Sequence, residues 1–175
     1  MLPWYDHNWI MHRTALRRFF FPRVTRRYIL RLLLVAVAAW VIFKYLLIPV
    51  RIRGISMEPT YRDGGVNVCW RLRYAFSDPR PGDLVAVRFS GRSLMMLKRV
   101  VAVAGDKVAF RGGVLYVNGK AVNEPYVVYP CHWNLSPRRV RPGHVYIVGD
   151  NRSVPMGEHN FGQTTTDRIM GAPLW

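Results

Sequence analysis

A long apolar run near the N-terminus constrains this chain more than any other feature. It extends over residues 32–50, LLLVAVAAWVIFKYLLIPV, and Lys44 is its only charged residue. As a helix this run would span roughly 28 Å, close to the thickness of a bilayer's hydrocarbon core. Lys44 lies towards the far end, where its long side chain can reach the headgroups, and Pro49 marks the exit. The run predicts a transmembrane anchor at 32–50.

Two other interpretations of the run remain open. A cleaved signal peptide would explain the basic start and the uncharged stretch 32–43, but the basic lead before it is long and no small-residue cleavage site follows. A buried core helix would explain the length of the run, although not the arginines beside it. The anchor accounts for both features.

The charge of the chain is strongly positive, with 26 Lys and Arg against 10 Asp and Glu. Residues 1–31 carry seven arginines and a single acid, Asp6. The positive-inside rule therefore predicts a basic cytoplasmic segment at 1–31 and places residues 51–175 across the membrane. Such an excess also suits nucleic acid, but neither a binding module nor basic residues interleaved with aromatics are present. We expect a membrane partner and no nucleic acid.

Residues 51–175 have the pattern of a β-rich domain. Alternating apolar residues in 68–76 predict one strand, and the apolar stretches 84–89, 94–103 and 145–150 predict others. The Asn118-Gly119 pair favours a two-residue hairpin turn, because both residues tolerate positive φ. Many short strands joined by Gly and Pro turns predict a mainly β fold, with antiparallel sheets forming a partly open, barrel-like domain.

Two polar residues stand out in these apolar surroundings. Ser56 lies in GISMEPT (54–60), just past the run, and Lys98 interrupts LMMLKRVVAV (94–103). An ordinary lysine, with a pKa near 10.4, is neutral in only about one molecule in 2,500 at pH 7. Apolar neighbours would lower that pKa, and a neutral lysine could then take the proton of a serine hydroxyl. Ser56 could equally fill a turn, and Lys98 could point to solvent. Because strand side chains alternate, however, either Lys98 or Arg99 must face the apolar side.

Five segments in one order carry a family resemblance: GISMEPT (54–60), GDLVAVR (82–88), LKRVVAVAGD (97–106), GVLYVNGKAVNEPY (113–126) and GHVYIVGDNR (143–152). Together they resemble the bacterial type I signal peptidase family, Ser–Lys dyad serine proteases also known as leader peptidases. The resemblance covers residues 50–175.

The resemblance implies a membrane-bound endopeptidase that removes signal peptides from exported preproteins with small residues before the cut. It assigns Ser56 as nucleophile and Lys98 as general base, with the Ser56 N–H as an oxyanion donor. Asp150, Asn151 and Arg152 would support the active-site loop. Met57, next to the nucleophile, would contact substrate. The family pattern requires no cofactor or metal.

The chain departs from the family pattern at several positions. Pro155, Gly157 and His159 stand where the family usually has a serine, an aspartate and an arginine, and Gly54 stands where some members have a second oxyanion serine. The family serine at the position of Pro155 supports the lysine, so its replacement here, Ser153 or a water molecule, is open.

Other functions are compatible with parts of the sequence. A conjugative pilin-processing Ser–Lys peptidase would share much of this fold, and an inactive membrane-tethered β-domain could bind exported polypeptides. A Ser–His enzyme is disfavoured, because no histidine accompanies a nucleophile-elbow motif. Cys69 and Cys131 lack metal-type spacing, and the sequence does not decide whether they form a disulfide.

Overall fold

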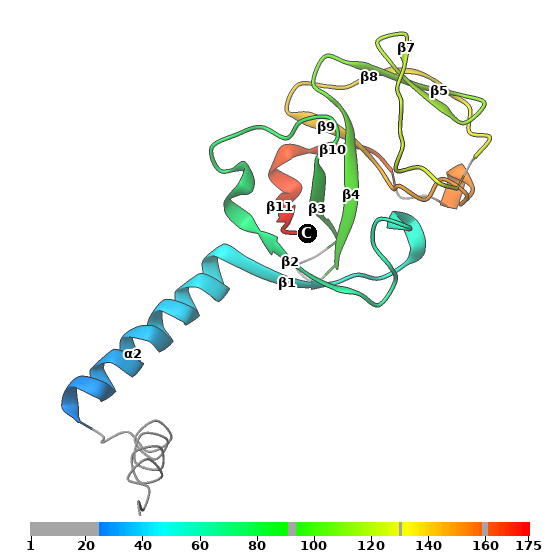
Figure 1. The fold of residues 1–175 in the computed structure, drawn as a ribbon. Helices are drawn as coiled ribbons and strands as arrows, with labels where there is room; N and C mark the ends of the chain where they lie inside the picture. The colour runs from blue at the N-terminus through cyan, green and yellow to red at the C-terminus, as the bar shows by residue number, and fades with distance from the viewer. Residues whose placement is uncertain (1–24, 91–93, 130, 159–160) are drawn as a thin grey trace, which may run out of the picture. The chain divides into compact units, whose positions relative to one another are not determined.

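The computed structural model describes residues 25–90, 94–129, 131–158 and 161–175 (Figure 1). The chain divides into two units, residues 1–42 and 43–175. The first contains helix α2 (Arg26–Val41), which begins after Thr25, whose hydroxyl accepts the Tyr28 N–H at 3.2 Å. No side chain of α2 is buried. A wider helical turn continues to Leu46, and the 21 residues from Arg26 to Leu46 are long and apolar enough to cross a membrane.

The apolar run predicted as one helix over 32–50 is helical only as far as Leu46. Its last four residues belong to strand β1 (Leu47–Arg51), which pairs antiparallel with β2 (Val66–Trp70) from Leu47 opposite Trp70 to Arg51 opposite Val66. Pro49 cannot donate a backbone hydrogen bond and is tolerated in an edge strand. The helix in turn begins earlier than predicted, because the arginines before Leu32 are good helix formers and Thr25 caps them.

The second unit is mainly β, as predicted. Its remaining strands are β3 (Leu84–Ser90), β4 (Leu94–Val103), β5 (Lys107–Arg111), β6 (Val114–Val117), β7 (Lys120–Ala121), β8 (Leu135–Arg139), β9 (His144–Val148), β10 (Gly162–Thr165) and β11 (Ile169–Pro173). A seven-stranded sheet has the order β1-β2-β11-β3-β4-β9-β10, and a four-stranded sheet has the order β7-β6-β5-β8. All pairs are antiparallel, and in the described residues neither sheet closes into a barrel.

The strand predicted over 68–76 is wrong beyond Trp70. Residues Arg71–Tyr74 form a short 3-10 turn, and Phe76 is 95% exposed. Trp70 already lies opposite Leu47, the first residue of β1, so the segment after it has no further partner in that strand. The predicted hairpin is confirmed: Asn118 and Gly119 connect β6 to β7 with φ of 51° and 80°.

In the part of the chain that the structure describes, the core consists of three clusters that surround the central strands. One joins the two sheets, one surrounds the segment after β1, and one lies along β3, β4 and β9. Neighbouring residues of β3 go to different clusters, Ala86 to the second and Val85 and Val87 to the third, as strand alternation requires. Strands β3 and β4 are thus covered on both faces, and a charge placed on β4 is forced into an apolar environment.

Candidate active site

Ser56 sits on a tight turn directly after β1. Gly54 has φ of +87°, a conformation that side chains disfavour, and its N–H donates to Asp63 Oδ1 at 2.7 Å. Residues Ile55–Met57 then form one 3-10 turn, closed by the Glu58 N–H donating to Ile55 O at 3.0 Å. The glycine therefore allows the sharp change of direction that presents Ser56 to strand β4.

Lys98 meets Ser56 from β4. Its Nζ lies 2.8 Å from Ser56 Oγ, and the lysine is only 2% exposed. It lies opposite Val85 of β3 and lines a cavity of about 70 Å³ together with Val87, Met96, Ile147, Phe161, Gly162, Gln163, Thr164 and Arg168. The structure thus brings together the two residues that the sequence predicted as a dyad.

Burial changes the acid–base properties of Lys98. Removal from water lowers its pKa from 10.5 to about 8, and the negative charge of Asp150 opposes part of that fall. At pH 7 a pKa of about 8 leaves roughly one lysine in ten neutral, against roughly one in 3,000 at the ordinary value. Lys98 can therefore serve as a base near neutral pH.

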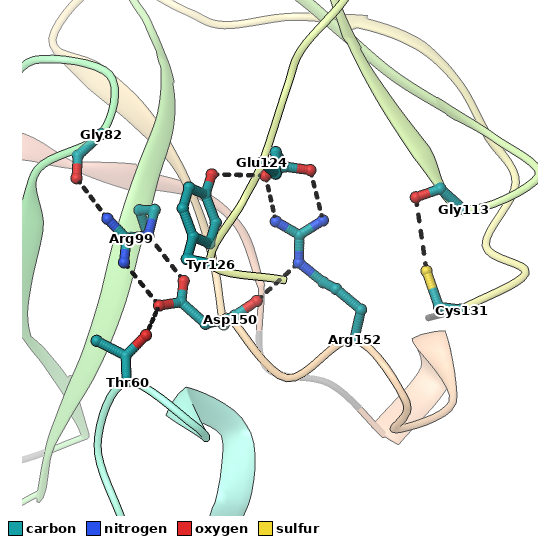
Figure 2. A network of polar contacts seen from close by, with 10 residues as sticks. Thr60, Gly82, Arg99, Gly113, Glu124, Tyr126, Cys131, Asp150 and Arg152 are labelled. Carbon is teal, nitrogen blue, oxygen red and sulfur yellow. Dashed lines mark hydrogen bonds and ion pairs between the residues drawn. The ribbon is translucent and has the colours of Figure 1, made fainter. Parts of the chain in front are cut away.

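Arg99 follows Lys98 on β4, and its charge is paired with Asp150. Its side chain contacts Asp150 twice, from Nε to Oδ1 at 2.8 Å and from Nη2 to Oδ2 at 2.7 Å, and Nη1 donates to Gly82 O at 2.8 Å (Figure 2). The Arg99 side chain is 12% exposed and that of Asp150 is fully buried. Lys98 is the neighbour that enters the apolar side, and Arg99 is neutralised by an ion pair.

Asp150 and Asn151 hold the loop that carries the nucleophile. Thr60 Oγ1 donates to Asp150 Oδ2 at 2.5 Å. The Asn151 N–H donates to Ser56 O at 3.1 Å, and its side-chain Nδ2 donates to Ile55 O at 3.1 Å. Three hydrogen bonds thus connect the Ser56 loop to the segment that follows β9.

Arg152 supports a different part of the domain. It is completely buried, donates from Nη2 and Nη1 to both oxygens of Glu124 at 2.6 and 3.1 Å, and donates from Nε to Gly149 O at 2.7 Å. Glu124 also accepts the Tyr126 hydroxyl at 2.7 Å. Arg152 therefore ties the segment after β7 to the segment that contains Asp150, and none of its described hydrogen bonds reaches the Ser56 loop.

Some sequence expectations do not match the structure. Met57 was expected to contact substrate, but it is 2% exposed and packs in the core cluster with Val50 and Leu97, because its side chain anchors the turn from below. Ser153 donates its hydroxyl to Asn151 Oδ1 at 2.7 Å, so it is not the support for Lys98. Gly157 and Pro155 lie on the surface, and His159 lies outside the described residues.

The two cysteines are free thiols. Cys69 is buried in the cluster below the Ser56 loop, and Cys131 packs against the cluster between the sheets. The two cysteines lie in different clusters and do not form the disulfide that the sequence left open.

Sequence reasoning missed Thr60, Glu124 and Tyr126. Each lies inside one of the five segments that carry the resemblance, which was the available signal. Thr60 contacts Asp150, 90 residues away, Glu124 contacts Arg152, 28 residues away, and the Tyr126 ring packs against Arg99 of another strand. No local pattern reveals such contacts.

The chain is similar to several known proteins. Residues 25–174 match the family described as signal peptidase, peptidase S26. Signal peptidase IB of Staphylococcus aureus is 32% identical over 161 residues, which cover 78% of this chain and 82% of that protein. The probable signal peptidase I-1 of Synechocystis is 31% identical over 128 residues, covering 69% of this chain and 65% of that protein, slightly under two thirds of its length.

Two further similarities are more distant. Thylakoidal processing peptidase 1 of Arabidopsis thaliana, a chloroplast protein, is 30% identical over 139 residues, covering 73% of this chain and 41% of that protein. The crystal structure of a signal peptidase I from Enterococcus faecalis shares 22% identity, covers 55% of this chain and 97% of that chain, and superposes with a TM-score of 0.45. With a family match over nearly the whole described chain, this protein belongs to the signal peptidase family, peptidase S26.

Proposed function

We propose that this chain is a membrane-anchored signal peptidase I that removes signal peptides from exported preproteins, with Ser56 as nucleophile and Lys98 as general base. One observation carries the assignment of residues: a buried lysine nitrogen lies 2.8 Å from the Ser56 hydroxyl oxygen. Family membership supplies the class of reaction, and the pKa of Lys98, lowered to about 8, makes the lysine a usable base.

In the first step neutral Lys98 accepts the Ser56 proton as Oγ attacks the scissile carbonyl carbon. The oxyanion that forms accepts a hydrogen bond from the Ser56 N–H. When the intermediate collapses, the Lys98 ammonium returns its proton to the leaving amine, which is the new N-terminus of the exported protein. Lys98 then takes a proton from a water molecule as that water attacks the acyl carbon, and returns it to Ser56 Oγ as the ester bond breaks and the signal peptide leaves.

The substrate would bind in extended form along the larger sheet. Strand β1 is at one end of that sheet and leads directly into the Ser56 turn, so a peptide added there would run towards the nucleophile. We propose that the open sheet curls as a partly open barrel, leaving a gap for this added strand. Small side chains before the cut would fit the restricted space around the dyad.

The apolar helix would serve as the membrane anchor. Residues 26–46 would form a single span in place of the 32–50 first expected, with the basic residues that precede it in the cytoplasm and the β unit on the outer side. Tethering the enzyme in the membrane that holds the signal peptide raises the effective concentration of the cleavage site.

The proposal is tested by incubating the full chain in detergent micelles with a model preprotein and mapping the new N-terminus. Ser56→Ala and Lys98→Met should abolish cleavage with the fold retained. Lys98→Arg should not restore it, because a guanidinium stays protonated at neutral pH. Continued turnover by Ser56→Ala would remove the serine from its proposed role.

A further inference from the structure

The guanidinium of Arg99 is enclosed on more sides than an ion pair requires. It donates hydrogen bonds to Asp150 and Gly82, and the Tyr126 ring covers it (Figure 2). The central carbon of the Arg99 guanidinium is 3.8 Å from the centroid of that ring. Such a cation–aromatic contact favours one orientation of a planar cation. Arg99 is therefore held both along its edge and over its face.

The Tyr126 ring is itself fixed. Its hydroxyl donates to Glu124 Oε1 at 2.7 Å, and Glu124 is held by both terminal nitrogens of the buried Arg152. Burial, followed by the hydrogen bond to Glu124, raises the pKa of Tyr126, so the hydroxyl stays protonated and keeps donating. Arg152 also donates to the carbonyl of Gly149, the residue before Asp150. The ring and the carboxylate on the two sides of Arg99 thus belong to one braced network.

This network reaches the loop that carries Ser56, and it acts on Lys98 through the charge of Asp150. Asp150 accepts from Thr60 of the Ser56 loop, and its charge acts on Lys98 in the direction that keeps the lysine protonated. The other charged side chain at the cavity beside Lys98, among the described residues, is Arg168, which is exposed to solvent. The extent to which Arg99 shares the charge of Asp150 therefore bears directly on the protonation of the base.

We propose that Tyr126 is a positioning residue for the reaction: its ring, packed over the face of the Arg99 guanidinium, keeps the edge of that guanidinium paired with Asp150, so that this carboxylate is neutralised and does not draw a proton onto Lys98. The inference rests on the proposed function, in which Lys98 must be neutral to act. Tyr126 touches neither Ser56 nor Lys98 in any described hydrogen bond, and it acts only through Arg99 and Asp150.

The experiment measures the pH dependence of kcat/KM for preprotein cleavage in Tyr126→Leu, Tyr126→Phe and wild type, using the full chain in micelles. Without the ring, Arg99 leaves Asp150 part of the time and the midpoint of the profile rises. A rise of about one pH unit would lower the rate at pH 7 about tenfold and leave the rate above pH 10 nearly unchanged. Tyr126→Phe keeps the ring and should keep the wild-type midpoint.

Tyr116 provides a matched control. Its ring lies under Arg111, 5.1 Å from the guanidinium carbon, in the four-stranded sheet. Tyr116→Leu removes a ring from beneath an arginine elsewhere, so the midpoint should stay at the wild-type value. If Tyr126→Leu does not fold, as judged by circular dichroism, Tyr126→Met replaces it and preserves the apolar bulk.

A second measurement separates this proposal from the proposed function. Competitive acetylation of Lys98 by acetic anhydride, followed by mass spectrometry, titrates the lysine without any cleavage. A wild type that fails to cleave would sink the proposed function alone, and the Lys98 midpoint would still decide the role of Tyr126. An unchanged midpoint in Tyr126→Leu, a loss of activity equal at every pH, or an equal shift in Tyr126→Phe would overturn the positioning role.

Discussion

Lys98→Met should make the protein inactive and at the same time more stable. Lowering the lysine pKa from 10.5 to about 8 means that the folded protein disfavours the charged lysine by about 3 kcal/mol at pH 7. Below pH 8 the lysine is protonated in both states, so this cost is fully present. Between pH 8 and 10.5 the folded state loses its proton first, the unfolded state binds more protons, and wild-type stability rises with pH. By pH 10 about 1 kcal/mol of the cost remains.

Methionine has no charge to bury, so the variant should be more stable than wild type by about 3 kcal/mol at pH 7 and by about 1 kcal/mol at pH 10. The lost hydrogen bond to Ser56 and any change in packing alter this difference by the same amount at every pH. The informative quantity is therefore how the difference in unfolding free energy changes with pH. The measurement is urea unfolding of the full chain in micelles, followed by circular dichroism at pH 7, 8, 9 and 10.

Lys107→Met is the matched control, because Lys107 lies at the start of β5 and is exposed. Its effect on the free energy of unfolding should not change between pH 7 and 10. If the difference between Lys98→Met and wild type were equally independent of pH, Lys98 would have an ordinary pKa in the folded protein. The reasoning that makes it the base would then be wrong.

Two more results follow from the structure. Asp150→Asn removes the charge that favours protonated Lys98, so the midpoint of the pH–rate profile should move to lower pH. A midpoint that moves to higher pH would contradict this expectation. The variant also leaves the largely buried Arg99 without its ion pair, so its free energy of unfolding in urea should fall by about 3–5 kcal/mol. A maleimide should label the half-buried Cys131 in the folded protein and Cys69 only after unfolding, because Cys69 is buried and burial raises its pKa to about 11. The labelling should be the same with and without reductant. Labelling that requires reductant would indicate a disulfide.

Local patterns were sufficient to predict the central strands and to single out Lys98, whereas the assignment of Ser56 and Lys98 as a dyad came from the family resemblance. Strands β3 and β4 are short apolar segments bounded by turn residues, and Asn118-Gly119 has the dihedral preferences of a tight hairpin. Lys98 was conspicuous because a charge within an apolar strand needs a reason. These features are written in neighbouring residues, so sequence alone can show them.

Contacts between distant segments could not be predicted in this way. Residues 47–50 are as apolar as the helix before them, and only the presence of β2 alongside makes them a strand. Conversely, 71–76 alternates like a strand but has no partner in β1 beyond Trp70. The burial of Met57 and the contact of Arg99 with Asp150 likewise depend on segments far apart in sequence. In each case the pattern was compatible with two structures, and tertiary packing selected one.

The short connection between the apolar helix and Ser56 would limit which peptide bonds can reach the nucleophile. Nine residues lie between Leu46 and Ser56, and five of them are fixed in β1. Even a fully extended chain of that length reaches no more than about 35 Å. If the helix is the membrane anchor proposed above, a polypeptide whose scissile bond lies farther than this from the lipid would not reach Ser56, whatever its side chains. With the helix in the membrane, as proposed, cleavage would therefore depend on the distance of the scissile bond from the bilayer as well as on the side chains around it.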